Sequence, residues 1–149
     1  MSFKFKKCES ENRLLKIPIN SAYIEKEIIE AKKDLESANN LLQHPDLKWA
    51  IVSSYFSMFH AFKSLLFSAG YEEKRSHDCL ITAIEELFVN KSLLPRSIIA
   101  SIREAKDSRE SADYGLTYSI ERARKSVTDA KEVYNEIVQY LINEGFKVT

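Results

Sequence analysis

Apolar residues recur at spacings of three and four along four long segments of the chain, and this pattern constrains the fold more than any other feature. Such spacing places apolar side chains on one face of an α-helix. The segments cover residues 24–42, 52–69, 98–112 and 120–141, and a shorter apolar segment covers 80–88. With only three Gly and three Pro, the chain has little material for the turns of a β-rich domain. The sequence therefore predicts an all-α fold, an up-and-down helical bundle of four long helices plus one shorter helix.

Helix-ending residues lie between these segments. Pro45 suits the first turn of a helix, and Gly70 suits a C-terminal cap. Ser76 and Ser119 can each cap the N-terminus of the helix that follows. Residues 1–19 lack helical periodicity, so we expect an N-terminal arm or a disordered segment there, followed by the bundle over residues 20–146.

Charge and hydropathy exclude several classes of protein. The 22 basic and 22 acidic residues cancel, so a site for RNA or nucleotide would have to be a local feature rather than a basic domain. The longest uncharged run, residues 49–62, is shorter than the roughly 20 residues that cross a bilayer. Cys8 and Cys79 stand far apart and form neither a zinc motif nor a disulfide framework. A reducing compartment, and hence a cytoplasmic location without membrane association, is expected.

The common catalytic and metal-binding motifs are missing. No His follows a Glu at the spacing of di-iron bundles, and there is no glycine-rich phosphate loop, GxSxG or HExxH. We therefore expect no metal and no cofactor. Two histidines remain as candidates, His60 in an apolar helix and His77 in a first helical turn. Each can be a structural histidine with one hydrogen bond. The helix dipole lowers the pKa of His77, so it can also act as a neutral base.

Arg109 stands in the wrong place for a charged residue. Spacings of four, three, four and three put it on the same helical face as the apolar residues of its segment: Ile98, Ile102, Ala105 and Ala112. A buried guanidinium needs a partner. That partner is either Asp113, four residues on, or the phosphate of a ligand, which suits the planar fork of Arg. The sequence leaves these two readings equal.

Several short motifs together resemble those of small stand-alone HEPN proteins. The run 54–61 is similar to their "YYAMFHA" helix. The likeness covers about residues 21–143 and continues, in order, through Leu65-Leu66, Gly70-Tyr71, Ser76-His77, Phe88-Val89, Leu94-Pro95, Arg109 and Ala112-Asp113-Tyr114. The resemblance implies an up-and-down bundle that usually forms a homodimer. It also implies a possible nucleotidyltransferase partner protein in a toxin–antitoxin pair.

Many HEPN proteins are metal-independent ribonucleases whose motif is an Arg followed, after four to six residues, by a His. The resemblance aligns Arg109 with that arginine, but Tyr114 stands where the histidine belongs. A phenol of ordinary pKa near 10 is a poor base at neutral pH, although it can donate a hydrogen bond or stack on a base. His77 or His60 can replace the imidazole only if the fold brings one of them to Arg109.

Three hypotheses follow for the function. The first is a module with a degenerate ribonuclease motif that binds nucleotide or RNA phosphate through Arg109, Asp113, Tyr114 and His60. The second is an active ribonuclease toxin that uses Arg109 with Tyr114 or with His77. The third is a structural dimerisation protein in which Asp113 holds Arg109.

Overall fold

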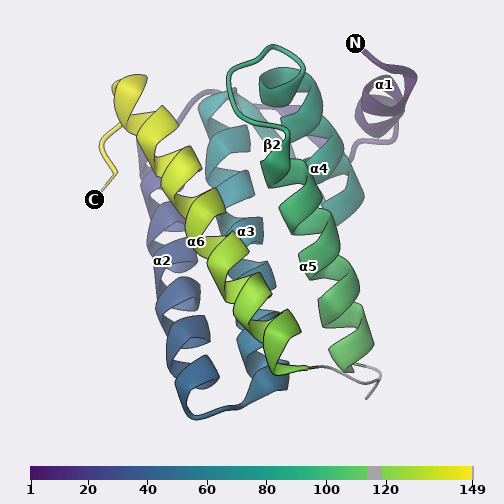
Figure 1. Ribbon diagram of the computed structural model, residues 1–149. Coiled ribbons are helices and arrows are strands. Elements are labelled where there is room, and N and C mark those ends of the chain that lie inside the picture. The colour runs from purple at the N-terminus through teal and green to yellow at the C-terminus, as the bar shows by residue number, and fades with distance from the viewer. Residues whose placement is uncertain (114–118, 149) are drawn as a thin grey trace.

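The computed structural model describes residues 1–113 and 119–148, although not the side chains of residues 112 and 113. Four long helices form the bundle (Figure 1): α2 (Ser21–Gln43), α3 (Leu47–Ser68), α5 (Ser97–Asp113) and α6 (Ile120–Asn143). A shorter helix, α4 (His77–Ile84), continues into a π-helical turn, η1 (Glu85–Val89). The fold is thus mainly α-helical, with four long helices and one shorter one between α3 and α5, as the apolar periodicity predicts.

The helix ends follow the capping residues. Gly70 adopts φ +79° directly after the last residues of α3, a conformation that favours glycine. The hydroxyl of Ser76 accepts a hydrogen bond from the amide of Cys79, and that of Ser119 accepts one from the amide of Arg122. The predicted caps at these three positions are confirmed, whereas Gly115 lies outside the described residues.

Helix α3 occupies the centre of the bundle. It packs against α2, α4, α5 and α6 (Figure 1), and its large side chains Tyr55, Met58, Phe62 and Leu65 are fully buried. This position explains why α3 is apolar on nearly every face. The side chains of α3 that remain partly accessible include Phe56, His60 and Lys63.

The N-terminal residues differ from the expectation of an arm or disordered segment. A short helix, α1 (Phe3–Ser10), precedes a strand, β1 (Leu14–Lys16), which pairs antiparallel with β2 (Tyr71–Glu73). Phe5 is fully buried, and its ring meets the edge of Tyr71 at 5.8 Å between centroids. With only Phe5 and Cys8 buried, α1 has too few apolar residues to show a helical stripe in the sequence.

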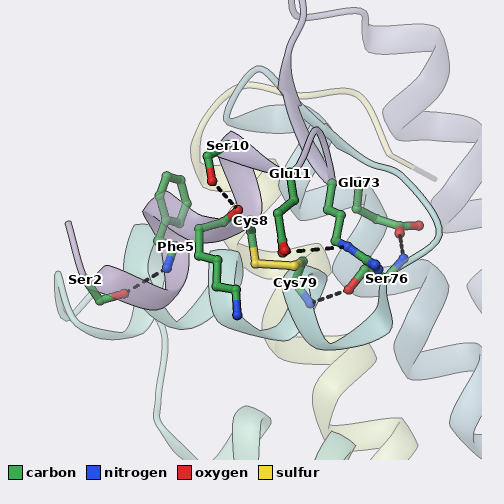
Figure 2. The surroundings of a disulfide bond; sticks show 10 residues. Ser2, Phe5, Cys8, Ser10, Glu11, Glu73, Ser76 and Cys79 are labelled. Carbon is green, nitrogen blue, oxygen red and sulfur yellow. Dashed lines mark hydrogen bonds and ion pairs between the residues drawn. A yellow bond between two sulfur atoms is a disulfide. The ribbon is translucent and has the colours of Figure 1, made fainter.

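The prediction that Cys8 and Cys79 form no disulfide is wrong. A disulfide joins Cys8 of α1 to Cys79 of α4 across a sequence separation of 71 residues, and both residues are buried (Figure 2). Their separation gave no hint of pairing, because only the return of β1 to β2 brings α1 beside α4. The inference of a reducing compartment from unpaired cysteines loses its basis. No helix in the described part of the chain combines the length and the apolar character needed to cross a membrane.

Candidate functional site

Arg109 lies where the helical spacing predicts, on the face of α5 that packs into the bundle. Ile98, Ile102 and Ala105 of that face are all buried, while Arg109 itself is partly buried. Its guanidinium carbon stands 5.4 Å from the ring centre of Tyr55 and 5.0 Å from that of Phe56. The charge therefore rests against aromatic rings of α3, an arrangement that stabilises a guanidinium through cation–π attraction.

His77 reaches the same rings from α4. Its Nδ1 is 2.5 Å from the hydroxyl oxygen of Tyr55, and its ring centre is 4.3 Å from that of Phe59. Tyr55 thus touches both Arg109 and His77. His77 and Arg109, 22 and 54 residues after Tyr55 in the chain, both meet its side chain, and the fold thus brings one of the two candidate histidines into the surroundings of Arg109.

The surroundings of His77 keep its imidazole neutral. Burial lowers the pKa of His77, and the positive charges of Arg109 and Lys106 act in the same direction. The carboxylates of Glu73 and Asp78 oppose this shift without reversing it. Sequence reasoning expected a lowered pKa from the helix dipole, whereas burial is the largest cause. His77 is therefore mainly unprotonated at neutral pH, the state in which an imidazole can accept a proton.

Tyr55 is a neutral hydrogen-bonding partner for that imidazole. Burial raises the pKa of the Tyr55 phenol above its usual value near 10, so its hydroxyl keeps its proton. Because Nδ1 of His77 is engaged by this hydroxyl, Nε2 is the ring nitrogen that can exchange a proton with a ligand. Sequence reasoning missed Tyr55, because a tyrosine within an apolar stripe looks like an ordinary core residue.

His60 has its partners on a different helix. Its Nδ1 is 2.6 Å from a carboxylate oxygen of Glu27, and its Nε2 is 3.7 Å from one of Asp34, both on α2. Burial raises the pKa of Glu27, but the hydrogen bond from His60 and the charge of Lys63 outweigh it, so the pKa is lowered overall. Both ring nitrogens of His60 thus face carboxylates, which fits a structural histidine better than a phosphate ligand.

The remaining predicted site residues cannot be placed. Tyr114 and the side chain of Asp113 lie outside the described residues, so the Arg109–Asp113 pairing stays a prediction. Within the described residues, no group of three or more His, Cys, Asp and Glu stands where it could hold a metal ion.

The chain resembles a known protein family and two curated proteins in sequence. The family model described as "HEPN domain" matches residues 24–141, which span α3, α4, α5 and all but the ends of α2 and α6. The chain belongs to the HEPN family. The elements outside that match include α1 and β1, so the disulfide tethers an N-terminal addition to the HEPN domain.

Two curated proteins are similar to this HEPN chain. A protein of Methanocaldococcus jannaschii named "Putative toxin MJ0142" is 29% identical over 124 residues, covering 82% of this chain and 84% of the relative. A protein of Pyrococcus horikoshii named "UPF0332 protein PH1297" is 29% identical over 104 residues, covering 70% of this chain and 72% of the relative.

Proposed function

We propose that this HEPN module binds the phosphate of RNA or of a nucleotide at the cluster formed by Arg109, His77, Tyr55 and Phe56. The observation that carries the proposal is the position of the Arg109 guanidinium, against the rings of Tyr55 and Phe56 and beside His77. A guanidinium held by rings keeps its donors directed, which suits bidentate hydrogen bonds to phosphate oxygens.

Two further features favour an extended nucleic-acid ligand. Lys106 adds a second positive charge to the surroundings of His77, and its ammonium also donates a hydrogen bond to Asp78 at 2.8 Å. Phe56 is only partly buried, and an accessible ring beside a cation can stack on an unpaired base. The chain as a whole has no net charge, so binding depends on this local cluster rather than on a long-range field.

The proximity of His77 to Arg109 supports a second candidate function, a metal-independent ribonuclease. In that reaction Nε2 of His77 accepts the proton of a ribose 2′-hydroxyl, and the 2′-oxygen attacks the neighbouring phosphorus. The bond from phosphorus to the 5′-oxygen breaks, a 2′,3′-cyclic phosphate forms, and the departing 5′-oxygen takes up a proton. Arg109 stabilises the added negative charge on the phosphate oxygens. His77 would thereby replace the imidazole that the sequence lacks at position 114.

The proposal includes the biological setting that the HEPN resemblance implies. The module acts in the cytoplasm as a homodimer and as the partner of a nucleotidyltransferase in a toxin–antitoxin-like system. The toxin-related name of a relative supports this setting. The partly accessible ring of Phe56 gives a second copy an apolar group to pack against on α3. A Phe56→Asp variant is therefore expected to be monomeric by light scattering while the wild type is dimeric.

Binding of a short single-stranded RNA tests the main proposal. The wild type, Arg109→Ala and Arg109→Lys are titrated into a fluorescein-labelled oligonucleotide in the presence of EDTA. We expect Arg109→Ala to weaken binding at least about tenfold, since a charged hydrogen bond of about 1.5–3 kcal/mol is lost. Arg124→Ala, at an exposed position on α6, is the matched control and retains wild-type affinity.

The same reactions distinguish the three hypotheses. Accumulation of 2′,3′-cyclic ends with the wild type but not with His77→Ala establishes the ribonuclease. Binding that requires Arg109, without cleavage, establishes the binding module. If Arg109→Ala changes neither binding nor cleavage and only lowers the melting temperature, Arg109 is structural and both functions fail.

A further inference from the structure

The disulfide is one of a small number of attachments that hold α1 against the rest of the protein. Helix α1 packs mainly against α4, and only Phe5 and Cys8 of its eight residues are buried. Beyond the disulfide, it is held by the burial of Phe5 and by a hydrogen bond from the Ser2 amide to Glu86 at 2.9 Å. A helix of this length is not stable alone in water, so its docking depends on these few contacts.

The other end of the disulfide lies in the turn that carries His77. Cys79 follows His77 by two residues in the first turn of α4. The Cys79 amide donates to the Ser76 hydroxyl at 3.1 Å, and the Ser76 amide donates to Glu73 at 3.0 Å (Figure 2). The bond from Cys8 is thus the covalent member of a set of contacts that fixes the backbone around His77.

Burial determines how this disulfide can react. Cys8 is 4% and Cys79 6% exposed, so a reductant reaches the sulfur atoms only when α1 moves away from α4. Once the bond is broken, the loss of the tether favours the undocked position of α1. Reduction and release of α1 therefore promote each other, which is the behaviour of a two-state device.

We propose that Cys8 and Cys79 form a reversible redox site that controls the docking of α1 and, through it, the position of His77. In the oxidised protein α1 is docked and the first turn of α4 is fixed. In the reduced protein α1 is released and that turn becomes mobile. The consequence for ligand binding rests on the proposed function, since it requires that His77 and Arg109 hold a phosphate.

The redox step is an exchange with a dithiol. A thiolate of the dithiol attacks one sulfur of the Cys8–Cys79 bond, giving a mixed disulfide and one free cysteine thiolate. The second thiolate of the dithiol then attacks the mixed disulfide and releases the other cysteine. The dithiol is oxidised to its disulfide, and Cys8 and Cys79 take up two electrons and two protons. Reoxidation by a disulfide compound reverses each step.

Hydrogen exchange of the full chain tests the structural half of the proposal. Oxidised wild type, wild type in dithiothreitol and the double variant Cys8→Ser, Cys79→Ser are compared by mass spectrometry. We expect amides of residues 3–10 and 76–80 to exchange at least about tenfold faster without the disulfide, while amides of α3 keep their protection. Dithiothreitol should not change the exchange rates of the double variant, because that variant has no disulfide to reduce. Equal exchange of residues 3–10 in all three samples would overturn the proposal.

RNA binding by the same three samples tests the functional half. We expect the two samples without the disulfide to bind the labelled oligonucleotide several-fold more weakly than the oxidised protein. Unchanged affinity despite faster exchange would overturn the coupling between α1 and His77. A loss of binding in every state, with the exchange difference intact, would instead reject the proposed function and leave the redox device established.

Discussion

The hydroxyl of Tyr55 and Nδ1 of His77 form a hydrogen bond of 2.5 Å that joins the central helix α3 to the first turn of α4. Both groups are neutral, because burial raises the pKa of the phenol and lowers that of the imidazole. A Tyr55→Phe variant keeps the ring and removes the hydroxyl. In this variant the partly buried Nδ1 of His77 lacks the Tyr55 hydroxyl as a partner, and the free energy of unfolding should fall by about 1–3 kcal/mol.

Urea unfolding of wild type and Tyr55→Phe measures that cost. Tyr140→Phe, at a partly exposed phenol on α6, is the matched control and should change stability by much less. An equal loss in both variants would show that the bond between Tyr55 and His77 contributes nothing specific.

The charges around His77 predict opposite responses of its pKa to two substitutions. Arg109→Ala removes a positive charge, so the pKa of His77 should rise toward its ordinary value of 6.5. Glu73→Gln removes a carboxylate that supports the protonated form, so the pKa should fall further. Titration of the ring resonances by NMR gives both values, and shifts of the same sign would contradict the described surroundings.

The depressed pKa of His77 also predicts how stability depends on pH. The unfolded state takes up a proton near pH 6.5, before the folded state does, so it binds more protons as the pH falls. The contribution of neutral His77 is therefore present above about pH 6.5 and is lost as the pH falls below it. Melting curves of the wild type and of His77→Gln should converge in acid. His44→Gln, at an exposed loop position, controls for the loss of a histidine.

Glu27 is expected to be the most sensitive carboxylate of the bundle. It is 8% exposed and accepts a hydrogen bond from His60 at 2.6 Å. Glu27→Gln replaces a charged hydrogen bond with a neutral one, and should cost about 1.5–3 kcal/mol in unfolding free energy at neutral pH. Because the folded pKa of Glu27 is lowered, the difference should be fully present above its unfolded value of 4.5 and should disappear as the pH falls below that value through the folded pKa. Asp34→Asn should cost less, since Asp34 lies 3.7 Å from His60.

Phe5 and Phe3 form a matched pair that tests whether α1 belongs to the core. Phe5 is fully buried and Phe3 is 83% exposed on the same helix. Phe5→Ala should lower the unfolding free energy by about 3 kcal/mol or more, and Phe3→Ala should leave it nearly unchanged. Thermal unfolding under oxidising conditions measures both. Similar melting temperatures for the two variants would mean that α1 is a surface appendage.

Apolar periodicity and capping residues were sufficient to predict the bundle, because α2, α5 and α6 each bury one apolar stripe against a nearly all-apolar α3, and capping residues mark helix ends. The same periodicity located Arg109 as a charge on an inward face. It did not locate Tyr55, since nothing in the sequence distinguishes a buried tyrosine that forms a hydrogen bond with a histidine from one that only fills space.

Contacts between residues far apart in the chain could not be predicted from the sequence. The carboxylate partners of His60 lie on α2, 26 and 33 residues earlier in the chain, and no local spacing relates them to it. The disulfide and the three-residue strands depend on the return of the N-terminus to residues 71–79, where neither the length nor the composition of the segment indicates a strand.

The pairing of β1 with β2 has a consequence for biosynthesis. Residues 1–16 leave the ribosome before their partners, which are residues 71–73 for the strand and Cys79 for the thiol. Until those residues emerge, Phe5 and Cys8 have no native contact to make. These residues are synthesised before their partners and reach their native contacts late, so they stay unfolded during the synthesis of α2 and α3.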